Sequence, residues 1–300
     1  MPQKSPIEWT DWTSNPLRAY RRGDRKAGWH CVKVSPGCQN CYAEKINMRL
    51  GTGLPFDKSS EPFIEILINR DELTALQKLN EQLAKRGTSE RVFVHDMTDV
   101  FGQFVSDTQL DELFDGFEAC ANLTIQVLTK RPHRAARYLV QRWSNGTPPN
   151  IHIGASVEDQ QRADERIPHL LKIPAGVLFL SVEPIIGPIQ FTRLHQHCPT
   201  HDFEGGFCSS ACPDARFVDW VIVGGESGQG CRETNLDWIH AITEQCGAAD
   251  VPCFVKQLGA KPYYLENDTK KLFEIRDSKG GDQRDFPCHF RRVLPNGIEA

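Results

Sequence analysis

The chain has 300 residues, of which 39% are hydrophobic and 25% are charged, and its net charge at pH 7 is −4. This composition is that of a globular protein that buries a core, in one large domain or two small ones. No stretch approaches the roughly 18 uninterrupted apolar residues of a membrane span, and no apolar signal segment is seen, so we expect a cytoplasmic protein. The acidic balance excludes an overall basic surface of the kind that nucleic-acid-binding domains carry.

Short apolar runs that are rich in β-branched residues predict about eight strands. In chain order, these strands span residues 7–12, 63–69, 91–96, 123–129, 150–157, 176–182, 219–225 and 251–257. The segments between them mostly have the period of a helix, so strands and helices alternate from residue 60 onward.

Three of the predicted helices have clear start or stop signals. Residues 71–85 place four leucines on one stripe, and Gly87 is expected to end that helix. Ser106 and Gln109 form a capping box for the next helix, and Pro132 suits the first turn of a third. A further helical stretch reaches to about residue 173, and Pro168 is expected to kink or split it.

Alternating strands and helices imply right-handed βαβ units and a parallel sheet. The count favours an α/β fold with a (β/α) barrel, complete or partial, of about eight parallel strands. We expect this barrel to span residues 1–265, with a small Cys/His-rich insertion at 195–212. Residues 266–300 are expected to form a C-terminal extension packed on the barrel.

Polar residues follow nearly every predicted strand, where such barrels build their active sites. The set comprises Asp96, Asp99, Lys130, Arg131, Ser156, Glu158, Glu183, Glu226, Lys256 and Gln257. The catalytic candidates are Glu183, Glu226, Lys130 and Lys256. The ordinary polarity of loops does not explain carboxylates that are embedded in the motifs SVEP and GGESG. The cations could hold a carboxylate or phosphate group. A structural ion pair of Glu183 with Lys130, Arg131 or Lys256 is the alternative.

Cys31, Cys38 and Cys41 form a C-x6-C-x2-C cluster without a fourth cysteine or histidine close behind. A structural zinc site needs four protein ligands, whereas a cubane iron–sulfur cluster held by three thiolates keeps one iron open. Gly28 and Gly37 supply backbone freedom for a chain that wraps a cofactor.

The segment GCQNCYA, after the first predicted strand, resembles the cluster motif of the radical S-adenosylmethionine superfamily. The resemblance implies a [4Fe–4S] cluster on Cys31, Cys38 and Cys41, whose open iron chelates S-adenosylmethionine. It also implies that Tyr42 packs against the cluster loop. The usual spacing in that superfamily is C-x3-C-x2-C, so the first interval is wider here.

Radical S-adenosylmethionine enzymes often use a GGE segment to hold the methionine amino group. Here GGE occurs at residues 224–226, after a late strand rather than the second one. Gly224 and Gly225 are therefore cofactor-binding candidates, and Glu226 is a site residue without that assigned role.

A larger set of motifs resembles a family of uncharacterised radical-SAM-like proteins common in phages and prophages. The motifs are WTDWTSNP, VSPGCQNCYAE, LTKRP, IGASVEDQQRADERI, FLSVEPIIGPI, DWVIVGGESG and VPCFVKQLG. They cover almost the whole chain, and the resemblance implies no particular substrate.

A second cluster, in residues 195–212, interrupts the alternation of strands and helices. Cys198, His201, Cys208 and Cys212 have spacing close to that of a zinc finger, which predicts a structural zinc site. An auxiliary iron–sulfur cluster and an unmetallated loop are the alternatives.

The leading interpretation is a radical S-adenosylmethionine-type enzyme that needs an electron donor. The resemblance to phage proteins and the basic runs at residues 18–26 and 129–137 suggest a nucleic acid or nucleotide substrate. Each run is otherwise an ordinary solvated face. Two other functions stay open: a non-catalytic zinc-binding protein, and a metal-dependent hydrolase that uses the strand-end carboxylates.

Overall fold

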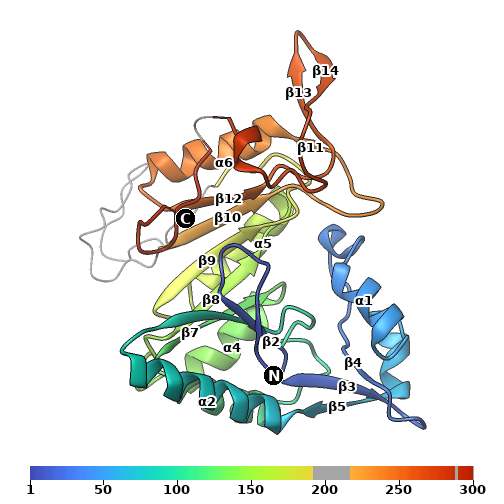
Figure 1. Ribbon diagram of the computed structural model, residues 1–300, viewed down its shortest axis with the longest axis vertical. Helices are drawn as coiled ribbons and strands as arrows, with labels where there is room; N and C mark the ends of the chain where they lie inside the picture. The colour runs from blue at the N-terminus through green and yellow to red at the C-terminus, as the bar shows by residue number, and fades with distance from the viewer. Residues whose placement is uncertain (192–216, 288–289, 300) are drawn as a thin grey trace.

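A computed structural model describes residues 1–191, 217–287 and 290–299. Its main sheet has eight strands in the order β1-β2-β6-β7-β8-β9-β10-β12. Their bounds are β1 Gln3–Lys4, β2 Trp12–Ser14, β6 Glu90–Val94, β7 Leu123–Thr129, β8 Ile151–Ser156, β9 Val177–Val182, β10 Trp220–Gly224 and β12 Cys253–Gln257. All neighbours pair in parallel except β1 and β2. The sheet is a curled half-barrel (Figure 1), so the predicted α/β fold is confirmed in its partial form.

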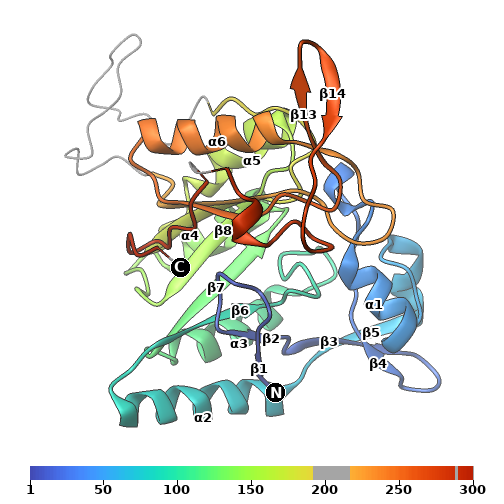
Figure 2. The ribbon, with the colours of Figure 1, turned by 45° about the horizontal axis from the view of Figure 1, so that its top comes forward.

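Helices connect the parallel strands and cover the outer face of the sheet (Figures 1 and 2). They are α2 Arg70–Arg86, α3 Asp107–Glu118, α4 Pro132–Arg142, α5 Gln160–Leu170 and α6 Leu236–Ala248. The predicted signals are confirmed in three of them. Gly87 ends α2 in the left-handed conformation, Ser106 and Gln109 form the capping box of α3, and Pro132 lies in the first turn of α4. None of the described helices is long and apolar enough to cross a membrane.

The structure differs from two local predictions. The first strand does not span residues 7–12; the chain instead pairs at β1 and β2, and Trp9 turns inward to the core between them. Pro168 does not split α5, which continues to Leu170. A proline so close to the end of a helix removes one hydrogen bond without interrupting the preceding turns.

The predicted strand at 63–69 exists as β5 (Ile64–Ile68), but it lies outside the main sheet. It pairs antiparallel with β3 (Leu17–Arg21), and β3 also pairs with β4 (Ala27–Gly28). The basic run at 18–26 is therefore a hairpin, in which Arg21 pairs with Asp24 and Arg25 with Glu65 on the surface. These surface ion pairs fit the solvated face that was the alternative to nucleic-acid binding.

The remaining elements lie at the edges of the half-barrel. They are α1 Tyr42–Leu50, β11 Thr234–Asn235, β13 Pro262–Glu266, β14 Thr269–Leu272 and three short 3-10 helices, η1 Pro36–Cys38, η2 Lys58–Phe63 and η3 Gln283–Asp285. Strands β13 and β14 form a hairpin that projects from the sheet (Figure 1). Downstream of it, Arg292 donates to the carbonyls of Val255 and Lys256 in β12.

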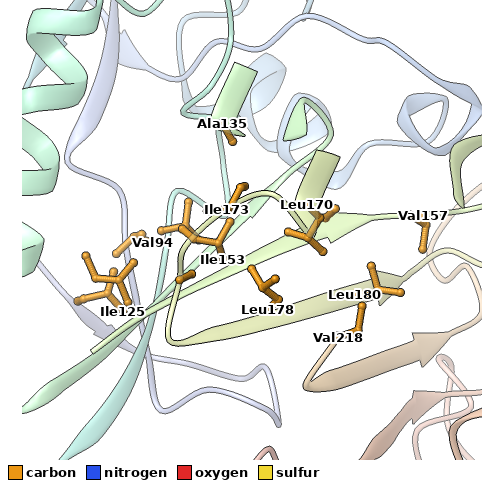
Figure 3. Packing of buried hydrophobic residues seen from close by; sticks show 14 of the residues in the cluster. Val94, Ile125, Ala135, Ile153, Val157, Leu170, Ile173, Leu178, Leu180 and Val218 are labelled. Carbon is orange, nitrogen blue, oxygen red and sulfur yellow. The ribbon is translucent and has the colours of Figure 1, made fainter. Parts of the chain in front are cut away.

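Side chains of the parallel strands alternate between two buried faces, as strand geometry requires. The helix-covered face is aliphatic, and it includes Val94, Ile125, Ile153 and Leu180 (Figure 3). The concave face is mainly aromatic: it is filled by Trp9, Phe93, Phe179, Trp220, Ile222 and Phe254. Because both faces are buried, the strands read as nearly continuous apolar runs in the sequence.

Two histidines of the sheet region contribute a pH dependence to folding. Burial lowers the pKa of His95 to about 3 and that of His152 to about 4. Both are neutral in the folded protein but become protonated in the unfolded chain below its ordinary pKa of about 6.5. Their contribution to stability is therefore complete above that pH and is lost as the pH falls toward 4.

We expect His152→Leu to flatten this dependence by about 2 kcal/mol between pH 7.5 and pH 5, measured by urea unfolding. At pH 7.5 and above, the difference between the variant and the wild type should be constant. An unchanged slope between pH 7.5 and pH 5 would contradict the assignment.

Candidate functional site

Residues 29–42, here named the cysteine loop, carry Cys31, Cys38 and Cys41. All three are partly buried and form no disulfide. Cys38 ends η1, and Cys41 is the residue before α1. Cys31 and Cys41 pack against the same small apolar cluster, which includes Phe56 and Met97. The loop therefore holds three thiols on one short segment of chain.

The end of β7 is tied to the cysteine loop through Arg131. Its guanidinium pairs with Asp99, in the loop after β6, at 2.8 Å and donates to the carbonyl of Val32 at 2.6 Å. Asp99 also accepts from the Thr129 hydroxyl and from the backbone N–H of Lys130. One buried ion pair thus joins two neighbouring strand ends and the backbone between Cys31 and Cys38.

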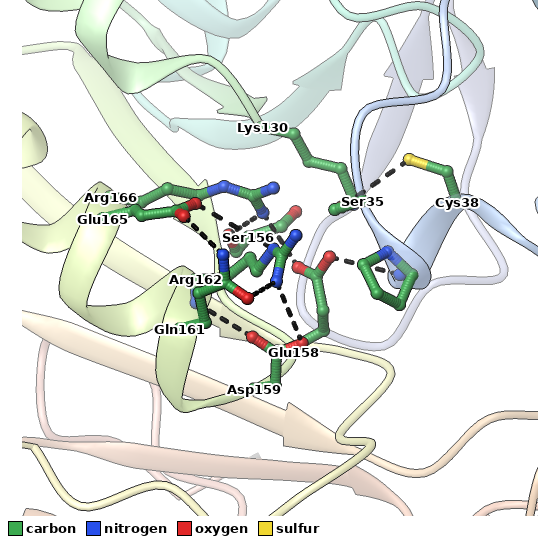
Figure 4. A network of polar contacts seen from close by, with 12 residues as sticks. Ser35, Cys38, Lys130, Ser156, Glu158, Asp159, Gln161, Arg162, Glu165 and Arg166 are labelled. Carbon is green, nitrogen blue, oxygen red and sulfur yellow. Dashed lines mark hydrogen bonds and ion pairs between the residues drawn. The ribbon is translucent and has the colours of Figure 1, made fainter.

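Glu158, which follows β8, makes a second tie (Figure 4). Its carboxylate is fully buried, pairs with Arg166 of α5 at 2.8 Å and accepts the backbone N–H of Gly37 at 3.2 Å. Burial opposes ionisation of this carboxyl, but Lys130, Arg166 and the hydrogen bonds outweigh it and lower its pKa. A Cβ at position 37 would lie 2.9 Å from the Glu158 carboxyl carbon, so this approach requires glycine.

Glu226, just after β10, makes a third tie. Arg232 pairs with its carboxylate at 2.6 Å, and the side-chain amide of Asn40 donates to it at 3.0 Å. The same arginine donates to the carbonyl of Pro36 at 3.0 Å. Although burial opposes it, the hydrogen bonds from Arg232 and Asn40 lower the pKa of Glu226. The predicted site residue Glu226 therefore helps to hold the cysteine loop near Pro36 and Asn40, whereas Arg131 holds it at Val32.

Tyr42 ties the start of α1 to the end of β6. Its hydroxyl donates to the backbone carbonyl of Asp96 at 2.6 Å, and Asn15 donates to the Asp96 carboxylate at 2.5 Å. Burial raises the pKa of the Asp96 carboxyl.

Glu183 and Lys256 form a direct ion pair at 2.6 Å, and each side chain is 19% exposed. Glu183 follows β9, whereas Lys256 lies within β12, so the pair spans β10. The structural alternative for Glu183 is therefore realised with Lys256 as the partner. Both charges nevertheless remain accessible at the edge where the strands end.

Lys130 has no ion-pair partner among residues 1–191, 217–287 and 290–299. Its charge opposes the burial-driven rise in the pKa of Cys41 and lowers the pKa of Glu158. It thus lies between the cysteine loop and the end of β8.

The two glycines of the GGE segment lie where β10 meets β12. A Cβ on Gly225 would be 2.3 Å from the carbonyl oxygen of Leu258, so close backbone packing accounts for this glycine. The predicted zinc ligands Cys198, His201, Cys208 and Cys212 lie outside the described residues.

The donor set of the cysteine loop fits an iron–sulfur cluster better than a single metal ion. Within the described part of the chain, no three Cys, His, Asp or Glu side chains gather closely enough to hold one ion. A cubane places each thiolate on a different iron, so its ligands need not meet at one point. Burial raises the pKa of Cys31 to about 11, and the nearby Arg131 opposes this rise. The charge of Lys130, which pairs with no carboxylate of the described residues and opposes the rise in the pKa of Cys41, therefore favours an anionic cluster at this position.

Three residues that build the site were not found from the sequence: Asn40, Arg166 and Arg232. Asn40 lies inside CQNC, and Arg232 lies six residues after Glu226, so proximity to a motif was their only signal. Arg166 is in a helix that reads as amphipathic and charged, and its burial depends on Glu158.

Solved structures of spore photoproduct lyase resemble the chain at 16% sequence identity. A variant of the lyase and the lyase complexed with dinucleoside spore photoproduct each have a TM-score of 0.42. A variant with bound AdoMet and dinucleoside spore photoproduct has a TM-score of 0.39. Each match covers 62% of this chain, and the chain spans about half of each lyase chain, 48% or 49%.

No curated protein matches the chain. A family model does: the one described as "Protein of unknown function (DUF5131)" matches residues 4–287, which is nearly the whole chain, and the protein therefore belongs to this family.

Proposed function

We propose that this protein is a radical S-adenosylmethionine-type enzyme whose [4Fe–4S] cluster is held by Cys31, Cys38 and Cys41. The observation that carries the proposal is the anchoring of the cysteine loop. Side chains that follow β7, β8 and β10 bind this loop, and a backbone carbonyl that follows β6 accepts from Tyr42 at the start of α1. Three thiols are thus presented at the carboxyl edge of the half-barrel, where (β/α) folds place their chemistry.

When bound, the cluster would supply the electron that cleaves S-adenosylmethionine reductively. This chain's own residues position the loop and shape the mouth. Arg131, held by Asp99, fixes the backbone just after Cys31. Glu158 fixes the backbone just before Cys38. Glu226 binds Asn40, which follows Cys38, and Arg232, which donates to the backbone before Cys38. The Tyr42 hydroxyl holds the start of α1 against the backbone that follows β6.

Glu183 and Lys256 are the proposed acid–base pair of the mouth. They are close enough to exchange a proton, at 2.6 Å, and their partial exposure leaves them open to a substrate. Lys130 is the proposed anion-binding residue, because its ammonium group pairs with no carboxylate in the part of the chain that the structure describes. Gly224 and Gly225 are proposed to contribute to cofactor binding at the same edge of the sheet.

The proposal extends to features outside the site. The motif resemblance to phage proteins favours a nucleic acid or nucleotide substrate, and reductive cleavage requires an electron donor in the cytoplasm. We further propose a structural zinc site at Cys198, His201, Cys208 and Cys212. The barrel would span residues 1–265, with residues 266–300 as an extension packed on it.

Anaerobic purification followed by iron and sulfide analysis tests the function. We expect brown protein with about four irons per chain, since a cubane contains that number. Dithionite and S-adenosylmethionine should then release 5′-deoxyadenosine, detected by liquid chromatography. Colourless protein that contains zinc alone would support the non-catalytic zinc-binding function instead. An iron-loaded protein that releases no 5′-deoxyadenosine would contradict the radical reaction.

A further inference from the structure

Six residues of the second basic run of the sequence, residues 129–137, line an open cleft of about 890 Å³. The lining comes from the cysteine loop, η2, the loop after β6, the start of α4, and α5. Its wall includes residues 32–34, which lie between Cys31 and Cys38. We name it the basic cleft.

The basic cleft has a surplus of positive charge. Seven lysine or arginine side chains line it, against two glutamates, Glu61 and Glu165. Four of the seven cations are paired internally: Lys33 with Glu44, Arg131 with Asp99, Arg134 with Asp107 and Arg166 with Glu158. These pairs build the wall and offer little charge to a ligand.

The other three cations, Lys58, Lys130 and Arg137, form no ion pair with any described residue. They come from three different elements: η2, the end of β7 and the second turn of α4. Lys130, just after β7, and Arg137, in α4, both line the cleft. Three separate cations around one opening suit several anionic groups along a chain better than one isolated anion.

The lining between these cations is partly apolar. Val34 is 42% exposed, although it is a large hydrophobic residue, and the half-buried ring of Phe104 lies on the same wall. His133 of α4 and His169 of α5 add two aromatic rings whose centroids are 6.2 Å apart. Cations that track a backbone, together with apolar and aromatic surfaces for bases, characterise grooves for single-stranded nucleic acid.

We propose that the basic cleft binds a single-stranded nucleic acid segment. Its phosphates would lie on Lys58, Lys130 and Arg137, and its bases would lie against Val34 and Phe104. Binding of the strand does not depend on the proposed function; only its assignment as the substrate rests on that function. A strand in the cleft would pass directly beside the cysteine loop, because Val32, Lys33 and Val34 belong to both.

The test measures binding by fluorescence anisotropy, with the full chain and without S-adenosylmethionine or dithionite. The probes are labelled dT and U oligomers of about ten nucleotides, the length that such grooves cover. A duplex of the same length is the third probe. The triple variant Lys58→Gln, Lys130→Gln, Arg137→Gln should bind the single strands about tenfold or more weakly at low salt. For this variant, the slope of log K against log salt concentration should be smaller in magnitude by about 2. Each lost phosphate contact lowers the magnitude of this slope by about 0.7, and the variant loses three contacts.

A matched control is the triple variant Lys78→Gln, Lys85→Gln, Arg86→Gln. It removes the same charge from exposed positions of α2, and it should bind as the wild type does. If the partly buried Lys130 is needed for folding, the double variant Lys58→Gln, Arg137→Gln replaces the triple variant. It should also bind the single strands more weakly than the wild type does.

Binding of either the dT or the U oligomer supports the proposal, and the two probes separate DNA from RNA. Equal losses in the cleft and α2 variants, or no binding by the wild type, would overturn it. Equally tight binding of the duplex would overturn the single-stranded assignment. Because no cluster chemistry enters this assay, its failure is distinct from a failure to bind iron or to release 5′-deoxyadenosine.

Discussion

Single replacement of Cys31, Cys38 or Cys41 by serine should reduce the iron content from about four per chain to near zero. Serine keeps the size of the side chain but replaces a soft thiolate with a hydroxyl, which is a poor ligand for iron at neutral pH. Release of 5′-deoxyadenosine should be lost with the iron. Iron analysis and liquid chromatography on anaerobically reconstituted protein measure both effects.

The matched control for these variants is Cys120→Ala. Cys120 is fully buried between α3 and β7 and is far along the chain from the cysteine loop. Its loss removes a thiol and should cost some stability without changing the iron content. If any one of the three loop variants retains the full cluster, that cysteine is not a ligand. This outcome is most informative for Cys31, which follows the wider interval of the motif.

Replacement of Glu158 by alanine should destabilise the fold by about 3–5 kcal/mol. The Glu158 carboxylate is fully buried and the Arg166 side chain is 7% exposed, so the variant leaves a buried guanidinium without its partner. Urea unfolding monitored by circular dichroism measures the effect. The same variant removes the acceptor for the Gly37 N–H, so Cys38 should also become more reactive toward iodoacetamide in the native state.

Two further variants show whether this cost comes from the unpaired charge. Glu165→Ala removes a carboxylate of α5, the helix that carries Arg166; the Glu165 side chain is 54% exposed, and the variant should change stability by less than about 0.5 kcal/mol. The double variant Glu158→Ala, Arg166→Ala should be less destabilised than the sum of the two single variants, because neither charge is then left alone. Strict additivity would contradict the ion-pair explanation.

The sequence by itself determined the type of fold and most of its elements. The apolar runs that became β6, β7, β8, β9, β10 and β12 are buried on both faces of the sheet, which is why they are recognisable without any partner. Caps such as Ser106 with Gln109, and the stop at Gly87, depend on residues within one turn of each other. Local physical chemistry is sufficient for features of this kind.

The sequence also placed the polar residues of the candidate site at the strand ends. In a parallel sheet all carboxyl ends share one edge, so order along the chain predicts Asp99, Glu158, Glu183 and Glu226 as neighbours of one mouth. What each carboxylate binds did not follow from that order. Glu183 pairs with Lys256 across β10, whereas Glu158 and Glu226 turn to the backbone and side chains of the cysteine loop.

Only the tertiary structure decided the roles of the two basic runs and the anchoring of the cysteine loop. Run 18–26 and run 129–137 have similar composition, yet Arg18, Arg21 and Arg25 of the first run pair with carboxylates of nearby elements, whereas most of the second run lines a cleft. Asn40 meets Glu226 across 186 residues of sequence. Such contacts depend on how distant segments pack, so the residues next to a side chain in the sequence do not predict them. The three cysteines were visible in the sequence, and the strand ends that hold them in place became visible only in the fold.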